Sequence, residues 1–277
     1  MEQKLKNKGD QICRTPNQAE LSIQGFLSKI QLSFTNVFIE KSPIKKGMRG
    51  LDLYTSAEES TLLLKALVGK KGKVTSIDAS SWYQYNLKQK PKRHQVRLLG
   101  KQLEYLPDKE KTSSFDFVYS GFFLNQVSNP LDFLQYVYDQ LEPNGFAMVE
   151  ELDYSKFQCF PDSIAFDHFL SLFLELKKRL GHDAKIGKKL HALFKQAKFN
   201  NCQTQLVRPT FLTRTSEKKS SHILKHISPL LLHEKLISLN ELQTLQLQLK
   251  EFEQQPNTMI TLPGTYQVLG FKSCVII

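Results

Sequence analysis

The sequence predicts an α/β fold in which helices cover both faces of a parallel sheet. Two observations support this class. Residues 50–78 form one strand–helix–strand unit, and strand and helix patterns continue to alternate as far as residue 150. With 277 residues, 40% of them hydrophobic, the chain is long enough for one large α/β domain or for such a domain with a cap.

The strand–helix–strand unit is the element around which the rest of the chain is organised. Leu51 and Leu53 begin a short buried strand, and apolar residues then recur at helical spacing from 62 to 67. A second strand, 74–78, ends on the acid Asp78. A parallel βαβ unit that ends on an acid is typical of a nucleoside-binding half-domain.

The turn after the first strand lacks the glycines that such a domain normally has. Residues 54–58 are Tyr-Thr-Ser-Ala-Glu, whereas a ligand approaches the backbone closely only where no Cβ intervenes. Ser56 and Glu59 instead fit the Ser-x-x-Glu capping box, and two acids, Glu58 and Glu59, suit the positive end of a helix dipole. These features predict a turn whose amides serve the helix start.

The remaining elements are expected in the following order. Residues 1–16 form a polar tail, 17–40 one or two helices, and 41–49 a basic linker. After the first unit, we expect a helix at 80–89, strands at 95–99 and 115–119, a helix at 130–141 and a strand at 146–150. Helices at 163–180 and 186–197, a strand at 203–208, a helical segment at 216–255 and a last strand at 266–271 complete the chain.

These patterns divide the chain into four parts. Residues 1–46 are the tail and a helical arm, 47–209 the α/β core, 210–259 a helical insertion or cap, and 260–277 the final strand of the core. In the insertion, Ser238 and Glu241 fit a capping box and predict a helix start.

The formal charge of +11 raises a nucleic-acid or anionic-membrane hypothesis. The basic residues are scattered, however, and the densest group, 88–94, is short, so a solvated basic surface is favoured and RNA association is the weakest functional reading. No apolar run is long enough to span a bilayer and no signal-peptide core is present, which predicts a cytoplasmic chain. The four cysteines lie far apart, which predicts free thiols and no metal site.

Five segments in order resemble the class I S-adenosylmethionine-dependent methyltransferases, especially the group that contains quinone-biosynthesis and other small-molecule enzymes. The segments are 47–53, 69–78, 115–119, Asn129-Pro130 and 141–145. The resemblance implies a Rossmann-like, seven-stranded sheet with only the last strand antiparallel, and a helical insertion before that strand. It also implies a cofactor at the carboxyl ends of the first strands.

The resemblance further implies a set of cofactor-binding positions. Asp78 stands where the family acid binds the ribose hydroxyls, and Gln102, or Lys101 beside it, stands near the adenine-contacting acid. Three glycine positions of the family carry larger residues here. The implied cofactor-site residues are Asp52, Tyr54, Ser56, Asp78, Gln102 and Gly121, with Glu58 at the third glycine position.

No catalytic residue is identified. Gln126 stands where many relatives carry histidine and does not serve as a general base, although methyl transfer often needs only alignment and desolvation. Glu150, Glu151 and Asp153 end the fifth strand, where an acid could touch a substrate, but no further ligand for a metal is found. An aromatic group spread over 157–173 fits core packing better than a substrate pocket.

Two functional readings stay open. In the first, which is favoured, the chain is a degenerate methyltransferase-like protein that binds a ligand or a protein partner without methyl transfer. In the second, it is an active enzyme that uses S-adenosylmethionine in a modified loop to methylate a small, partly apolar acceptor.

Overall fold

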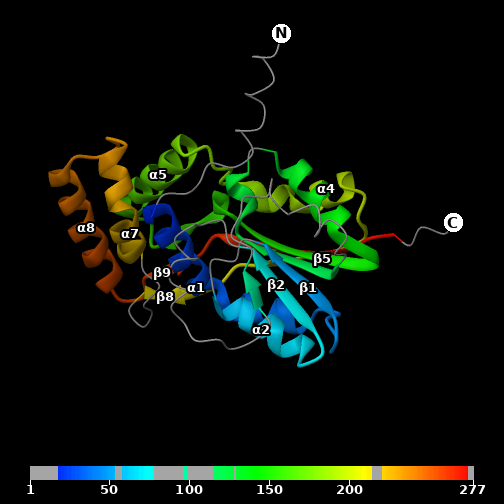
Figure 1. The fold of residues 1–277 in the computed structure, drawn as a ribbon. Helices are drawn as coiled ribbons and strands as arrows, with labels where there is room; N and C mark the ends of the chain where they lie inside the picture. Colours follow the sequence, from blue (N-terminus) through cyan, green and yellow to red (C-terminus); the bar gives the residue numbers. More distant parts are fainter. Residues whose placement is uncertain are drawn as a thin grey trace, which may run out of the picture.

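A seven-stranded sheet forms the centre of the molecule (Figure 1). The computed structural model describes residues 18–53, 58–77, 96–98, 115–127, 129–213 and 220–273. In spatial order, the strands are β3 (Val96–Leu98), β2 (Lys73–Ile77), β1 (Arg49–Leu53), β4 (Phe115–Gly121), β5 (Leu141–Asp153), β10 (Gly264–Phe271) and β7 (Asn200–Val207). The pairs from β3 to β5 are parallel, and β10 is antiparallel to both β5 and β7. This is the expected fold class, with one antiparallel strand.

Helices cover both faces because alternate strand residues point to opposite sides. On one face, α1 (Gln18–Glu40) and α2 (Glu58–Val68) pack over a cluster that includes Phe117 and Met148. On the other face, α4 (Pro130–Gln140) and α6 (Leu190–Gln196) pack over Val118 and Val149. The neighbouring residues 117 and 118 therefore belong to different cores, as a strand buried on both faces requires.

Local capping fixes the start of several helices. The Asn129 side chain accepts from the Asp132 amide directly before Pro130, where α4 begins. Ser163 caps α5 (Ile164–Arg179), and Gly181 follows that helix with φ +75°. Ser238 and Glu241 form both bonds of the predicted capping box at the start of α8 (Leu239–Gln254).

A helical cap packs beside the sheet. It joins α5, α8 and α7 (Ser220–His233) around an apolar cluster that also takes in Ile30 of α1. Under the cap lies a second, three-stranded sheet of β6 (Gln158–Phe160), β9 (Met259–Thr261) and β8 (Thr210–Leu212). We did not predict this sheet, because runs of three residues are too short to show a period.

Several expected boundaries differ from those in the structure. β5 begins at Leu141, not at residue 146, because Leu141 pairs with Phe115 before an irregularity in which Asn144 has φ 64°. The helix expected at 186–197 divides into a 3-10 turn, η4 (Ile186–Lys189), and α6. The helix expected at 80–89 lies outside the described residues. No helix in the described part of the chain is long and apolar enough to cross a membrane.

Candidate functional site

The carboxyl ends of β1 and β4 meet where an open α/β sheet binds its ligand. Asp52 of β1 pairs in register with Tyr119 of β4, and both side chains are buried. Thr61 in the first turns of α2 donates its hydroxyl to Asp52 Oδ2 over 2.5 Å. Asp52, one of the implied cofactor residues, is therefore engaged by the chain itself.

Tyr119 occupies the space next to Gly121, the second implied cofactor residue that the structure describes. A Cβ at Gly121 would lie 2.6 Å from the Tyr119 hydroxyl oxygen, so this glycine leaves room for the tyrosine. Burial raises the pKa of Tyr119 well above its ordinary value, the charge of Glu150 raises it further, and a hydrogen bond with Ser60 lowers it. The hydroxyl donates to Glu150 Oε1 over 2.7 Å.

Glu150 of β5 is the centre of a buried hydrogen-bond network. Its Oε1 also accepts from the Thr35 hydroxyl of α1 over 2.6 Å, and its Oε2 accepts from the Gln267 amide of β10 over 2.7 Å. Burial raises the pKa of Glu150, although all three of these hydrogen bonds lower it. The network connects α1, β4, β5 and β10 in the interior.

Glu151, the next residue, points to the opposite face of the sheet. It accepts from the Leu124 amide and from Asn125 Nδ2, in the 3-10 turn η2 (Leu124–Gln126) that follows β4. Lys177 of α5 donates to Asn125 Oδ1 over 3.3 Å and lies over the Tyr154 ring. Burial raises the pKa of Glu151 to about 8, although these hydrogen bonds and the Lys177 charge lower it.

The three acids at the end of β5 therefore do not form one site. Glu150 and Glu151 face opposite sides, and Asp153 accepts from the Ser155 amide at the start of η3 (Tyr154–Lys156). Within the described ranges, no group of three acids, histidines or cysteines is placed to hold a metal ion.

The other implied site residues lie outside the described ranges. Tyr54, Ser56, Asp78 and Gln102 are outside the described residues, as is the side chain of Glu58. The backbone of α2 begins at Glu58, directly after the glycine-free turn. The capping box expected for Ser56 therefore stays a prediction.

The networks of Glu150 and Glu151 were missed by sequence reasoning. Both acids were noted only as possible substrate contacts, and Thr35 and Gln267 were not noted at all. A glutamate pair inside an otherwise apolar strand was the available signal, because a buried carboxylate requires hydrogen-bond partners.

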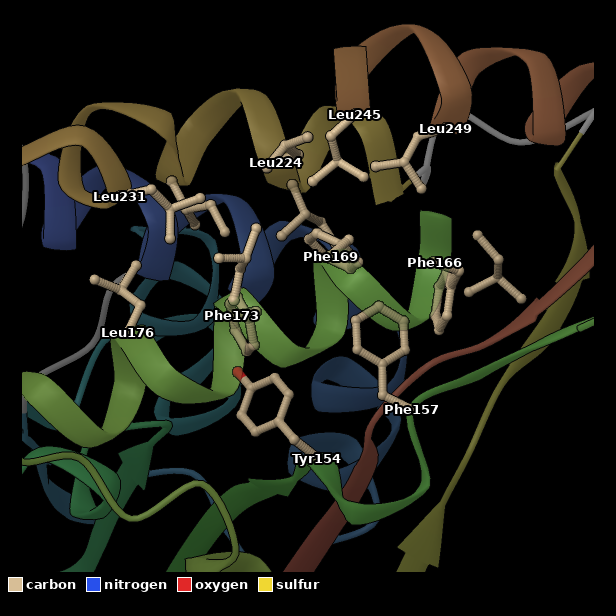
Figure 2. Packing of buried hydrophobic residues seen from close by; sticks show 14 of the residues in the cluster. Tyr154, Phe157, Phe166, Phe169, Phe173, Leu176, Leu224, Leu231, Leu245 and Leu249 are labelled. Atoms are coloured by element: carbon tan, nitrogen blue, oxygen red, sulfur yellow. The ribbon is translucent and has the colours of Figure 1, made fainter. Parts of the chain in front are cut away.

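The aromatic group around residues 157–173 fills the interior of the cap. Figure 2 shows Tyr154, Phe157, Phe166, Phe169 and Phe173 packed against one another beneath leucines of α7 and α8. The centroids of the Phe157 and Phe166 rings are 5.2 Å apart, and the two rings are nearly perpendicular. These side chains pack with one another, as the sequence favoured, and do not line an open pocket.

The two implied cofactor residues that the structure describes, Asp52 and Gly121, both contact other residues of the chain. Asp52 is bonded to Thr61, and the space beside Gly121 is taken by the Tyr119 hydroxyl. The backbone of α2 begins with two acids, Glu58 and Glu59. The absence of a side chain at Gly121 thus leaves room for the Tyr119 hydroxyl.

The sheet order, the single antiparallel strand and the helical cap define a Rossmann-like class I methyltransferase fold. A model of the ubiE/COQ5 methyltransferase family matches residues 27–204, and the chain belongs to this S-adenosylmethionine-dependent family. A search of curated proteins gives no match.

Solved structures show the same fold at low sequence identity. A cyclopropane-fatty-acyl-phospholipid synthase-like protein from Lactobacillus casei is 14% identical, with a TM-score of 0.57 over 95% of this chain and 96% of that one. A methyltransferase of Haloferax volcanii, in complex with the Trm112 methyltransferase activator, is 12% identical, with a TM-score of 0.55 over 93% of this chain and 100% of that one. A Bacillus halodurans methyltransferase structure is 16% identical, with a TM-score of 0.53 over 87% and 99%.

Proposed function

We propose that this chain is a degenerate member of its methyltransferase family that binds a ligand or a protein partner without standard methyl transfer. The observation that carries the proposal is the closed arrangement at the carboxyl ends of β1 and β4. There, Asp52 is bonded to Thr61, and Tyr119 occupies the space next to Gly121. A carboxylate oxygen and space that a ligand would need are used within the protein.

Sequence at the cofactor turn supports the same proposal. Tyr54, Ser56 and Glu58 replace three glycines, so each adds a side chain where the backbone of a nucleoside-binding turn must be bare. Glu58 and Glu59 add two negative charges where the cofactor carboxylate would lie. Both steric and electrostatic effects oppose S-adenosylmethionine.

The alternative is an active S-adenosylmethionine-dependent methyltransferase that uses a modified loop on a small, partly apolar acceptor. Membership of the family and the complete sheet favour it. Because methyl transfer often proceeds by alignment alone, the lack of an identified base does not count against this alternative.

A protein partner has a structural precedent. The Haloferax volcanii neighbour was solved with an activator protein bound to it. A family fold that has lost its cofactor site would keep an outer surface able to bind another chain, although the identity of that chain is not implied by the neighbour.

Calorimetric titration with S-adenosylmethionine and S-adenosylhomocysteine tests the proposal. We expect no heat of binding and no thermal stabilisation at millimolar ligand. If the ligand bound, stabilisation would reach about 2.7 kcal/mol at a hundredfold excess over Kd. Submillimolar binding of either compound would contradict the degenerate reading and favour the active enzyme.

A charge-only variant separates the two causes. Glu58→Gln/Glu59→Gln removes the negative charges without removing the side chains from the turn. If the turn is closed sterically, this variant should bind the cofactor no better than the wild type. Recovery of binding in this variant would assign the loss to charge repulsion.

A further inference from the structure

A run of basic residues from the last turn of α5 to just beyond α6 accounts for much of the positive charge. Residues 177–198 contain eight lysines and arginines against one acid, Asp183. No aspartate or glutamate occurs from residue 184 to residue 216. This run is longer than the group at 88–94, and its charge is concentrated on one part of the fold.

Four lysines of this run are exposed and available to a partner. Lys185, Lys188, Lys195 and Lys198 are all exposed, and none forms an ion pair within the described ranges. The one acid is already compensated, because Asp183 Oδ2 lies 2.6 Å from Lys189 Nζ. The positive field of the four lysines is therefore not neutralised locally.

Lys195 of α6 and Lys198 lie beside the edge strand of the sheet, whereas Lys185 and Lys188 belong to η4 and its N-cap, which pack on β5 and β10. His191 of α6 is hydrogen-bonded to Thr204 of β7 over 2.7 Å, and Lys195 lies close enough to Cys202 to affect its thiol electrostatically. β7 is the last strand of the sheet order and exposes Asn201 and Gln203. We call Lys185, Lys188, Lys195, Lys198, Asn201, Gln203 and Thr204 the basic edge.

We propose that the basic edge binds the phosphate backbone of a nucleic acid. Lys188 of η4 and Lys195 of α6 are seven residues apart in two elements that follow each other directly, so roughly 10 Å of helical backbone separates them, a span that matches phosphates a few nucleotides apart. The eight residues of β7 extend about 26 Å, long enough to follow several nucleotides. Exposed amide and hydroxyl groups beside the lysines supply hydrogen bonds to phosphate, sugar or base edges.

The composition of this surface favours a nucleic acid over a membrane. The exposed positions of α6 are His191, Ala192, Lys195 and Gln196. A helix that lies on a membrane needs large apolar side chains on its buried face, and the exposed face of α6 carries none larger than alanine.

The inference goes beyond the proposed function. None of the residues of the basic edge belongs to the cofactor turn, so the binding of a nucleic acid and the binding of S-adenosylmethionine are measured independently. A negative result for nucleic-acid binding therefore leaves the proposed function standing, and the reverse also holds.

Fluorescence anisotropy with labelled probes of about 20 nucleotides tests the proposal. The probes are single-stranded RNA, duplex RNA and duplex DNA of one sequence. Each probe is titrated with the full chain, which is first freed of bound nucleic acid at high salt. If about four phosphates are contacted, affinity should fall roughly 50- to 150-fold between 50 and 200 mM salt. Binding of any probe in this manner supports the proposal, and the order of affinities identifies the nucleic acid preferred.

A matched pair of charge-reversal variants localises the binding. Lys188→Glu/Lys195→Glu changes the basic edge, while Lys45→Glu/Lys70→Glu makes the same charge change at exposed lysines near the amino ends of β1 and β2. We expect the first variant to lose at least tenfold in affinity at 100 mM salt, and the second to lose less than threefold. For duplex probes, the slope of log affinity against log salt concentration should also become shallower by roughly 1.8, in the first variant only.

Four results would overturn the proposal. They are no binding to any probe, binding that does not weaken with salt, an equal loss in both variants, and tighter binding to phosphatidylserine vesicles than to all nucleic acids. An equal loss would show that the overall charge of the chain, and not this surface, attracts the probes. Circular dichroism of both variants confirms that they are folded in every comparison.

Discussion

At the scale of single residues, neighbouring acids of β5 serve different parts of the molecule. Glu150 connects Tyr119, Thr35 and Gln267 on the face covered by α1, whereas Glu151 holds the turn after β4 on the opposite face. The period of two along a strand gives this separation. Both acids are buried and satisfied by hydrogen bonds, as groups in a low-dielectric interior must be.

Tyr119→Phe should destabilise the protein by about 1 to 2 kcal/mol, because Glu150 loses a buried donor. Urea unfolding measures the change. Tyr136→Phe is the matched control, since the buried Tyr136 hydroxyl has no hydrogen-bond partner among the described residues. The control should change stability by no more than about 0.5 kcal/mol. Equal effects of the two substitutions would contradict the role of the Tyr119 hydroxyl.

The raised pKa of Glu151 predicts how stability depends on pH. Its folded pKa of about 8 lies above the ordinary value of 4.5, so the folded state holds a proton that the unfolded state has released. The contribution of Glu151 to the free energy of unfolding is fully present below pH 4.5 and is lost as pH rises to about 8. The loss is no more than about 1.4 kcal/mol per pH unit.

The Glu151→Gln variant isolates this contribution from the other titrating groups. Its stability relative to wild type should improve as pH rises from 5 to 8, and level off above pH 8. Urea unfolding at each pH provides the comparison. Parallel stability profiles for the two proteins would show that Glu151 does not titrate in this range.

At the scale of elements, α1 is attached to the sheet by a buried hydrogen bond as well as by apolar packing. Thr35 donates to Glu150, and the Phe34 carbonyl accepts from Gln267 over 3.3 Å. Phe38 and Ile39 of α1 pack in the cluster between the helix and the sheet. The helix of the predicted helical arm thus packs into the core on that face.

Thr35→Val should loosen α1 more than it loosens the sheet, because it removes the hydroxyl and keeps the shape. The expected cost is about 1 to 3 kcal/mol, since Glu150 loses a buried partner. Hydrogen exchange measures the local effect as faster exchange in α1. Thr35→Ser keeps the hydroxyl and should exchange like the wild type; if it exchanges as fast as Thr35→Val, the hydrogen bond is not the cause.

Sequence patterns predicted the longer elements because these carry local signals. Helices were predicted at 130–141 and 163–180, where α4 and α5 are found, and Ser238 with Glu241 marked the start of α8. The small sheet of β6, β8 and β9 carries no such signal, because its strands pair across about 50 to 100 residues of chain. The early start of β5 was also missed, since Leu141 is paired only through its contact with Phe115.

At the scale of the whole molecule, the fold was predictable and the interior networks were not. Five ordered segments of sequence indicated the family, and the family model and the sheet order confirm it. By contrast, Thr35 and Gln267 are 115 and 117 residues from Glu150, so no local pattern connects them. The lysines of the basic edge are local in sequence, within residues 185–198, and only the placement of α6 beside β7 needed the structure.

In the proposed function, this chain keeps the family fold and loses the cofactor site. The sheet retains the parallel order of the family, while the described ends of β1 and β4 are occupied by Thr61, Asp52 and Tyr119. Fold stability depends on packing on both faces, so a change confined to one turn need not disturb it.

Paired calorimetric titrations of the wild type and Tyr54→Gly/Ser56→Gly/Glu58→Gly with S-adenosylhomocysteine test the central claim most directly. The account predicts no binding by the wild type, and binding by the glycine variant would assign the loss to the side chains of the turn rather than to the ends of β1 and β4. Submillimolar binding by the wild type would contradict the account.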